Sequence, residues 1–182
     1  MTAASETVSV TPSVHVAFAR ADADERVAAR ALLRSLLAEV APEAAGLPLG
    51  SASGRPFLVG CADLDVSLSH DGGWVAAAVG ARIGVDVQVP VAVSESMVNR
   101  CCGPEDRLKL AALPPAERDR EFAWLWTVQE ACVKAEGTGL AGSPWSVPVR
   151  VGAVAGQWRE FRWLSLREVA DVPVSCAYLE TT

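Results

Sequence analysis

The stretch RIGVDVQVP, from Arg82 to Pro90, has the alternating pattern of a β-strand. Its isoleucine and valines recur at every second position and share one face, because side chains two residues apart in a strand point the same way. The other face carries Asp86 and Gln88, two oxygen-bearing side chains spaced to share one ligand. A face in contact with water is the ordinary explanation for such a pair, and a ligand-binding face is the alternative.

The pattern on either side of this strand predicts an α+β protein. The first half is predicted to contain strands at 13–22, 65–70, 74–80 and 82–89, a leucine-rich helix that ends before Pro42, and a loop at 46–56. The second half is predicted to contain two short helices within 94–113, a longer helix from Pro115 to Glu136, and strands at 145–152, 158–166 and 172–180. Each half is thus a helix followed by hairpin-connected strands, which is typical of α+β layers and suggests a structural duplication.

The composition is that of a globular protein. The chain has 182 residues, of which 51% are hydrophobic and 21% charged, and a net charge of −6, which argues against a nucleic-acid-binding surface. No apolar run approaches the ~20 residues that cross a bilayer. The start, MTAASETVSV, lacks a basic region and an apolar core, so we expect a cytoplasmic protein without a membrane partner. Five cysteines without C-x-x-C spacing predict neither a disulfide framework nor a zinc site.

Three side chains form a stripe along the predicted long helix. Trp126, Glu130 and Lys134 are four residues apart, so they lie on one face. A solvated Glu–Lys pair, which contributes about 0.3 to 0.5 kcal/mol on a helix surface, is the simpler interpretation. The adjoining tryptophan favours a position beside a cleft.

The segment SLSHDGG, Ser67 to Gly73, contains serine, histidine and aspartate in a row. They cannot form a hydrolase triad, because neighbouring strand residues point to opposite faces. His70 is either a structural histidine or a donor to an anion. Two alternatives also apply to the arginine stripe that starts at Arg26 and to Arg55 in the loop SGRP. These arginines are either solvent-exposed side chains without a ligand or part of a phosphate-binding edge.

Four motifs together resemble a known family. GRP (54–56), SLSHDGG (67–73), GVDVQ (84–88) and WTVQEACVKAEGTGL (126–140) occur in the order and approximate spacing of the 4′-phosphopantetheinyl transferases. The resemblance is to their larger, pseudo-dimeric class, which modifies carrier proteins of polyketide and nonribosomal peptide synthesis. It implies two similar α/β subdomains, 1–89 and 90–182, related by a pseudo-twofold axis in a monomer, with the coenzyme A site between them.

The resemblance also implies the reaction. The 4′-phosphopantetheine arm of coenzyme A would pass to a serine of an apo acyl or peptidyl carrier protein, giving the holo protein and 3′,5′-ADP. Asp86, Glu130 and the neutral Gln88 would hold Mg²⁺, or Mn²⁺ in its place, against the pyrophosphate. Glu130 would also be the base for the serine proton, and Lys134 would stabilise the phosphates and the leaving group.

Further contacts follow from the same resemblance. Coenzyme A would be bound by Arg26, Arg55, Ser69, His70 and Lys134. An acidic carrier helix would need a basic and apolar landing surface, which we expect in the segment MVNRCCGPEDRLKL, residues 97–110, with Arg100, Arg107 and Lys109.

Several positions depart from the family pattern. Gln88 stands where many relatives carry a second acid, and Gln129 replaces a lysine that often precedes the glutamate, which removes a cation near the cleft. Asp71 follows the histidine where a small polar residue is commoner, and Cys101-Cys102 replaces an aromatic pair. The two glutamines leave one alternative open, a catalytically weak relative that binds coenzyme A or a carrier protein without turnover. A generic hydrolase is less well supported, because no nucleophile and base can be placed within reach.

Overall fold

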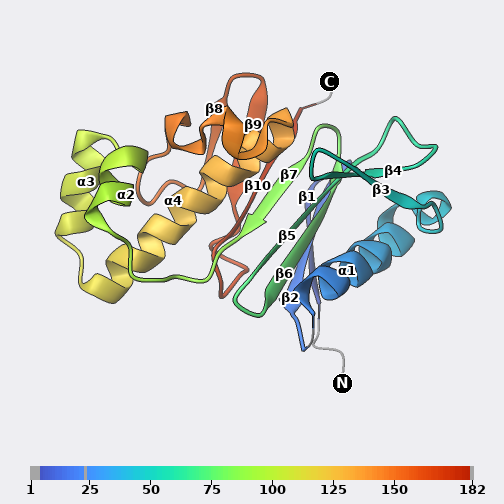
Figure 1. The fold of residues 1–182 in the computed structure, drawn as a ribbon, viewed down its shortest axis with the longest axis horizontal. Coiled ribbons are helices and arrows are strands. Elements are labelled where there is room, and N and C mark those ends of the chain that lie inside the picture. The colour runs from blue at the N-terminus through green and yellow to red at the C-terminus, as the bar shows by residue number, and fades with distance from the viewer. Residues whose placement is uncertain (1–4, 23, 181–182) are drawn as a thin grey trace.

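The computed structural model describes residues 5–22 and 24–180, and its α+β fold confirms the predicted class (Figure 1). The helices are α1 (Glu25–Val40), α2 (Glu95–Cys101), α3 (Pro104–Ala111) and α4 (Pro115–Glu136). The strands are β1 (Glu6–Thr11), β2 (Val14–Arg20), β3 (Leu49–Ala52), β4 (Arg55–Leu58), β5 (Asp65–Asp71), β6 (Trp74–Gly80), β7 (Gly84–Val87), β8 (Ala155–Trp158), β9 (Phe161–Ser165) and β10 (Val174–Leu179). None of the described helices has the length and apolar character that a membrane span requires.

The first sheet is antiparallel, with the strand order β1-β2-β6-β5, and α1 lies against it (Figure 1). Asp24 caps α1, because its side chain accepts the backbone N–H groups of Arg26 and Val27. The helix buries four leucines against the valines and alanines of the sheet: Leu32, Leu33, Leu36 and Leu37. Each buried leucine contributes roughly 1.5 to 3 kcal/mol, so this stripe fixes α1 on the sheet.

The second sheet has the order β7-β10-β9-β8 and carries α4. Successive residues of α4 face different cores: Trp124 packs in the cluster of β7 and β10, and Leu125 packs in the cluster that includes α3 and β9. The helix ends at Gly137, whose φ of 85° is the left-handed conformation that glycine adopts freely. Helix α4 is therefore buried on several sides and is a rigid element of the fold.

Gly84 allows α4 to lie directly against β7. A Cβ atom at this position would clash with the carbonyl oxygen of Ala131 and the amide nitrogen of Ala135. The backbones of helix and strand can approach this closely only because position 84 has no side chain. The close approach brings the last turns of α4 to the edge of β7.

The two sheets meet along β5 and β7, which are their edge strands. Side-chain oxygens of β5 accept the backbone N–H groups of every second residue at β7. These bonds join Ser67 to Val85, Ser69 to Val87 and Asp71 to Val89, at N to O distances of 3.0, 3.3 and 2.8 Å. We call these three bonds the side-chain ladder. It replaces the backbone pairing that one continuous sheet would have, and it satisfies amide groups that would otherwise be buried without partners.

In the second half one predicted strand is wrong, and another begins too early. Residues 145–152 are not a strand: a 3₁₀ turn occupies Pro144–Ser146, and Pro148 has no N–H to give to a sheet. The valines there alternate because they are buried in the core, not because they pair. The predicted strand 158–166 contains β9, but Trp158 belongs to β8 and pairs with Phe161 across a two-residue turn.

The first half contains strands that the sequence did not predict. The expected loop 46–56 holds the hairpin of β3 and β4, which turns at Ser53 and Gly54, both with positive φ. Strand β1 precedes the predicted first strand and pairs with β2.

Strand β7 lies before the expected subdomain boundary at residue 89 but pairs with β10 of the second half. The division into 1–89 and 90–182 stays a prediction.

Candidate active site

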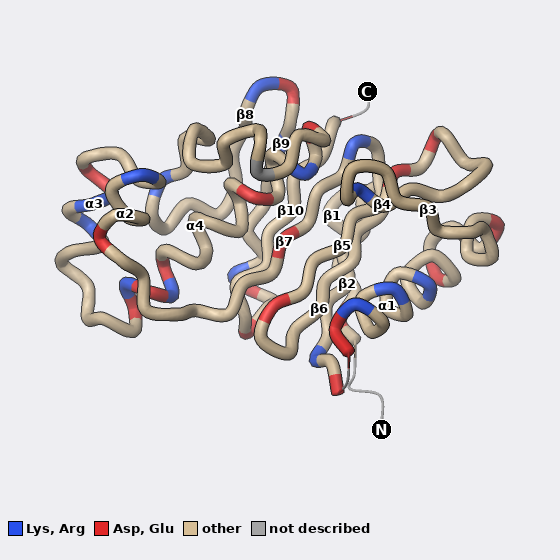
Figure 2. Tube along the Cα trace, in the orientation of Figure 1, with Lys and Arg blue, Asp and Glu red and all other residues tan. Residues whose placement is uncertain are grey.

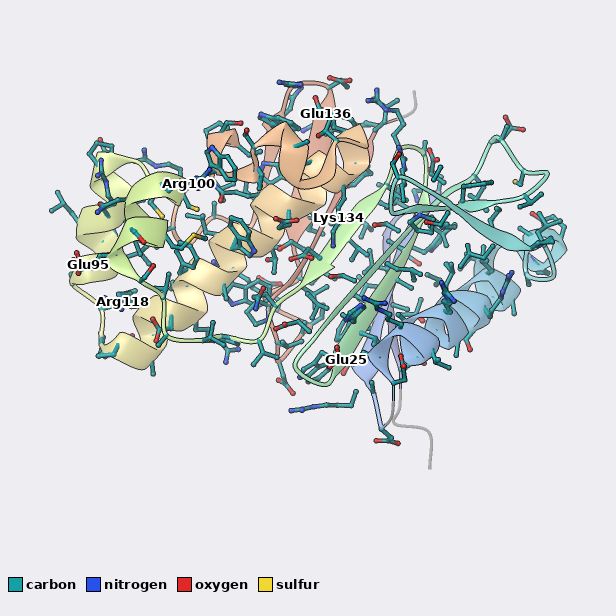
Figure 3. The ribbon with its side chains drawn as sticks, viewed as in Figure 1. Glu25, Glu95, Arg100, Arg118, Lys134 and Glu136 are labelled. Atoms are coloured by element: carbon teal, nitrogen blue, oxygen red, sulfur yellow. The ribbon has the colours of Figure 1, made fainter. Side chains whose placement is uncertain are left out.

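Asp86 is a buried carboxylate on β7, with 6% of its surface exposed. Its Oδ1 accepts two hydrogen bonds, from Ser69 Oγ at 2.7 Å and from Lys134 Nζ at 2.7 Å. Lys134 also donates to the carbonyl oxygen of Val85 at 3.1 Å. The Lys134 side chain extends from α4 toward β7 (Figure 3). The structure thus brings Asp86 and Lys134, from the two halves of the sequence, into contact.

Glu130 lies one turn before Lys134 on α4. Its Oε1 is buried and has no hydrogen-bond partner among the described residues. Burial and, secondarily, the charge of Asp86 raise the pKa of Glu130 to about 7, while Lys134 opposes the rise. An unpartnered carboxylate with a near-neutral pKa, next to a second carboxylate, is suited to accept a proton or to bind a cation.

Arg55 and the end of α4 border an open pocket of about 430 Å³. Glu130, Lys134, Gly137 and the turn at Ser53 also line it. The Arg55 guanidinium lies 3.4 Å from Asp65, and a Cβ at Gly137 would clash with it. This places a cation at the carboxyl end of α4, where the helix dipole favours one, and beside the carboxylates of the candidate site.

His70 and Arg26 lie where β5 meets the start of α1. His70 Nδ1 is 3.0 Å from Glu25 Oε2, and Glu25 Oε1 accepts the N–H of Gly73 at 2.6 Å. The hydrogen bond from the Gly73 amide, and secondarily the hydrogen bond from His70, hold the pKa of Glu25 below its usual range. Arg26 follows on the exposed side of the helix, where α1 carries a line of basic residues (Figure 2). Both predicted contacts are therefore exposed at one end of the β5–α1 packing.

Gln88 and Asp71 contact each other. Gln88 Nε2 donates to Asp71 Oδ2 at 2.9 Å, and the same oxygen accepts the amide of Val89. Two of the departures from the family pattern, Gln88 and Asp71, thus form one hydrogen-bonded pair. Gln88 also lines a hollow of about 320 Å³ with Trp126, between β7 and the start of α2. Its role as a metal ligand stays a prediction.

Gln129 is not at the cleft. It is fully buried, and its Nε2 donates to the carbonyl oxygens of Cys101 and Val147, each at 3.0 Å. One residue of helix turns a side chain by about 100°, so Gln129 faces the core while Glu130 faces β7. The expectation that Gln129 changes the charge of the cleft is wrong. Its bonds instead tie α4 to the end of α2.

The donor set fits one hard divalent cation. Within residues 5–22 and 24–180, no group of three or more histidine, cysteine, aspartate or glutamate side chains is placed to hold a metal. Asp86 and Glu130 nevertheless supply two carboxylates, and Glu130 Oε1 is a buried oxygen in need of a partner. Mg²⁺ binds through one or two carboxylates plus phosphate and water, so two acids are sufficient.

Sequence reasoning missed Glu25 and the role of β5. The signal for the side-chain ladder was present, since Ser67, Ser69 and Asp71 alternate on one strand, but only the structure shows that β7 lies opposite. Glu25 gave no signal beyond its place in the first turn of a helix, where acids are common.

Comparisons with known proteins identify the family of the chain. The family model for the 4′-phosphopantetheinyl transferase superfamily matches residues 82–175, which include β7, α4 and most of the second sheet. The chain belongs to the 4′-phosphopantetheinyl transferase superfamily. Within it, the chain is similar to the Sfp class, which confirms the resemblance noted in the sequence.

The similar curated proteins come from Bacillus. A 4′-phosphopantetheinyl transferase of Bacillus subtilis is 28% identical over 99 residues, which are 53% of this chain and 44% of that protein. The 4′-phosphopantetheinyl transferase Sfp of Bacillus subtilis (strain 168) is 29% identical over 89 residues, 48% of this chain and 40% of that protein. The psf-1 transferase of Bacillus pumilus is 27% identical over 90 residues, 49% and 39% of the two chains. The matches thus span less than half the length of each relative.

Proposed function

We propose that this protein transfers the 4′-phosphopantetheine arm of coenzyme A to a serine of an apo acyl or peptidyl carrier protein. The products would be the holo carrier protein and 3′,5′-ADP. The observation that carries the proposal is the meeting of Asp86, Glu130 and Lys134 at the edge of β7, with one buried Glu130 oxygen left without a partner. Membership of the transferase superfamily and the similarity to the Sfp class support the same reaction.

The carboxylates supply the charge that the reaction needs. Asp86 and Glu130 would hold Mg²⁺, or Mn²⁺, which when bound neutralises the pyrophosphate of coenzyme A. Lys134 has three N–H donors, of which Asp86 and Val85 take two, so one is left for a phosphate oxygen. Arg55, which lines the pocket with Glu130 and Lys134, is the proposed contact for a further phosphate. His70 and Arg26, at the end of β5 that meets α1, are proposed as coenzyme A contacts on the family resemblance.

Glu130 is the proposed general base. Its pKa of about 7 allows it to accept the proton of the carrier serine near neutral pH. The serine oxygen then forms a bond to the β-phosphorus as the bond between that phosphorus and the bridging oxygen breaks. The phosphopantetheine stays on the serine, and 3′,5′-ADP leaves with the electron pair of the broken bond.

We also propose that the two halves are similar subdomains of one monomer, related by a pseudo-twofold axis. Each half contributes a four-stranded antiparallel sheet covered by a helix, α1 on one and α4 on the other, and the site lies where the two sheets meet (Figure 1). Because β7 pairs with β10, the structural boundary would fall before β7 and not at residue 89.

The carrier protein is proposed to bind at the surface of α2 and α3. Arg100 is exposed and stacks over the Trp145 ring at 3.5 Å. A hollow between α2 and α3 is lined by Arg107, Leu108 and Arg118, with the acid Glu95 at its side. These basic and apolar groups suit an acidic amphipathic helix. Arg100→Glu combined with Arg107→Glu should raise the KM for the carrier protein and leave the KM for coenzyme A unchanged. An unchanged carrier KM would contradict this surface.

Intact-mass spectrometry tests the function. Several apo carrier proteins are incubated with the enzyme, coenzyme A and Mg²⁺, and a gain of roughly 340 Da, one phosphopantetheine arm, is expected on at least one of them. Release of 3′,5′-ADP in equal amount should accompany it. No gain with any carrier or with Mn²⁺, although coenzyme A binds, would contradict transfer and indicate a binding module.

A further inference from the structure

Ser69 differs from the other serine of the side-chain ladder in one contact. Both Ser67 and Ser69 are buried, and each accepts a backbone N–H from β7. Only Ser69 also donates its hydroxyl hydrogen to a side chain, the Oδ1 of Asp86 at 2.7 Å. The two serines therefore have the same structural role, and Ser69 has an additional one at the site.

The contacts of Asp86 fall on one of its two oxygens. Ser69 and Lys134 both donate to Oδ1, and in the described part of the chain no donor takes Oδ2. The terminal torsion of an aspartate is soft, so a carboxylate without such bonds can turn about its axis. Two donors from different elements, one on β5 and one on α4, fix it.

We propose that Ser69 is a positioning residue, which holds the Asp86 carboxylate so that its free oxygen, Oδ2, is the single oxygen that this residue gives to the divalent cation. The inference rests on the proposed function, and it names which atom of the site does the binding. Outer hydrogen bonds to a ligating carboxylate typically change metal affinity 10- to 100-fold when they are removed.

This role competes with a direct phosphate contact. A serine has one O–H, and the Ser69 hydrogen is already given to Asp86 while its oxygen accepts from Val87. The family resemblance implied that Ser69 contacts coenzyme A. In this structure Ser69 has no hydrogen left to donate to a phosphate of coenzyme A. The two roles predict different losses when the hydroxyl is removed.

The test compares Ser69→Ala with Ser67→Ala, which removes an equivalent ladder bond but no contact with Asp86. Mn²⁺ is titrated into each ligand-free protein and followed by electron paramagnetic resonance. Ser69→Ala should weaken Mn²⁺ binding about 10-fold or more, whereas Ser67→Ala should leave it within about twofold. At saturating Mn²⁺, the KM of Ser69→Ala for coenzyme A should equal that of the natural protein.

Three results would overturn the inference. Equal losses of Mn²⁺ affinity in the two variants would reduce Ser69 to a structural residue, and thermal unfolding of both variants shows whether either has lost its fold. An unchanged Mn²⁺ affinity with a raised KM for coenzyme A would make Ser69 a nucleotide contact. Absence of Mn²⁺ binding by the natural protein would show that Asp86 does not bind a divalent cation. Absence of transfer with the expected Mn²⁺ difference would contradict the proposed function and not this inference.

Discussion

Lys134 on α4 and Asp86 on β7 form an ion pair with an Nζ to Oδ1 distance of 2.7 Å, although 48 residues separate them in the chain. The pair spans the contact between helix and strand that Gly84 allows. Glu130 lies one turn away with a raised pKa, so the three groups are coupled electrostatically.

Lys134→Met is expected to abolish most of the transfer activity. It removes the cation that binds Asp86 and faces the proposed phosphate site, and losses of about 10² to 10³ in kcat are typical for such a group. Steady-state kinetics with coenzyme A and a carrier protein measure the loss. Arg162→Ala, which removes an exposed arginine paired with Glu180, is the control and should keep full activity. A Lys134→Met enzyme within threefold of the natural rate would contradict the assignment.

Gly84→Ala is expected to lower the free energy of unfolding by about 1 to 3 kcal/mol, because the new methyl group must displace the backbone of α4. The same displacement should separate Lys134 from Asp86 and reduce kcat. Urea denaturation measures the first effect. Gly46→Ala is the matched control, since a Cβ there meets no atom within 4 Å. Equal stability of the two variants would show that α4 does not depend on the close approach.

The rate of transfer should rise with pH through about 7, as Glu130 loses its proton and becomes a base. Bound cation favours the charged carboxylate, so saturating Mg²⁺ should move the apparent pKa of the rate profile downward. The pH dependence of kcat/KM at two Mg²⁺ concentrations measures both. A profile that is flat between pH 5.5 and 8.5 at the lower Mg²⁺ concentration would argue against Glu130 as the base.

The stability of the metal-free protein should fall as pH rises from about 4.5 through about 7. The pKa of Glu130 is higher in the folded protein than its ordinary value, so the folded state keeps a proton that the unfolded state has lost. Glu130→Gln should remove this dependence and stabilise the protein at pH 8 by about 1 to 2 kcal/mol, after discounting for screening by water. Chemical denaturation in EDTA at pH 5 and pH 8 checks the sign.

Gln88→Glu should destabilise the protein, because it places a carboxylate at hydrogen-bond distance from Asp71. A loss of about 1 to 3 kcal/mol is expected from the lost bond and the repulsion. Asp71→Asn should restore part of it in the double variant, since it removes the charge of one of the two facing carboxylates. A double-mutant cycle by urea denaturation measures the coupling. Additive effects would show that the pair is not coupled.

The sequence predicted the elements whose pattern is local. The Pro115 start, the apolar residues and the Gly137 stop defined α4, and the motif positions gave Asp86, Glu130 and Lys134 before any geometry was known. It could not predict the partner of β7, because strand pairing with β10 is set by contacts across about 90 residues. It also mistook the buried Val147 and Val149 for a strand, since burial and pairing give the same alternation.

Contacts between side chains were the least predictable part of the site. Ser69 was expected at a phosphate, but its hydroxyl bonds to Asp86, and Gln129 was expected at the cleft, but it is buried. Both observations have one explanation: a motif gives the position of a residue along an element, whereas the rotamer and the neighbouring strand decide what its side chain contacts.

The most direct test of the central claim is a parallel intact-mass measurement on one carrier protein that the natural enzyme modifies. The natural protein and Glu130→Gln, both shown to be folded by circular dichroism, are incubated with the carrier, coenzyme A and Mg²⁺ for the same times. We predict that the natural protein adds one phosphopantetheine per carrier and that Glu130→Gln is slower by about 10² or more. A Glu130→Gln protein that modifies the carrier at the natural rate would contradict the account.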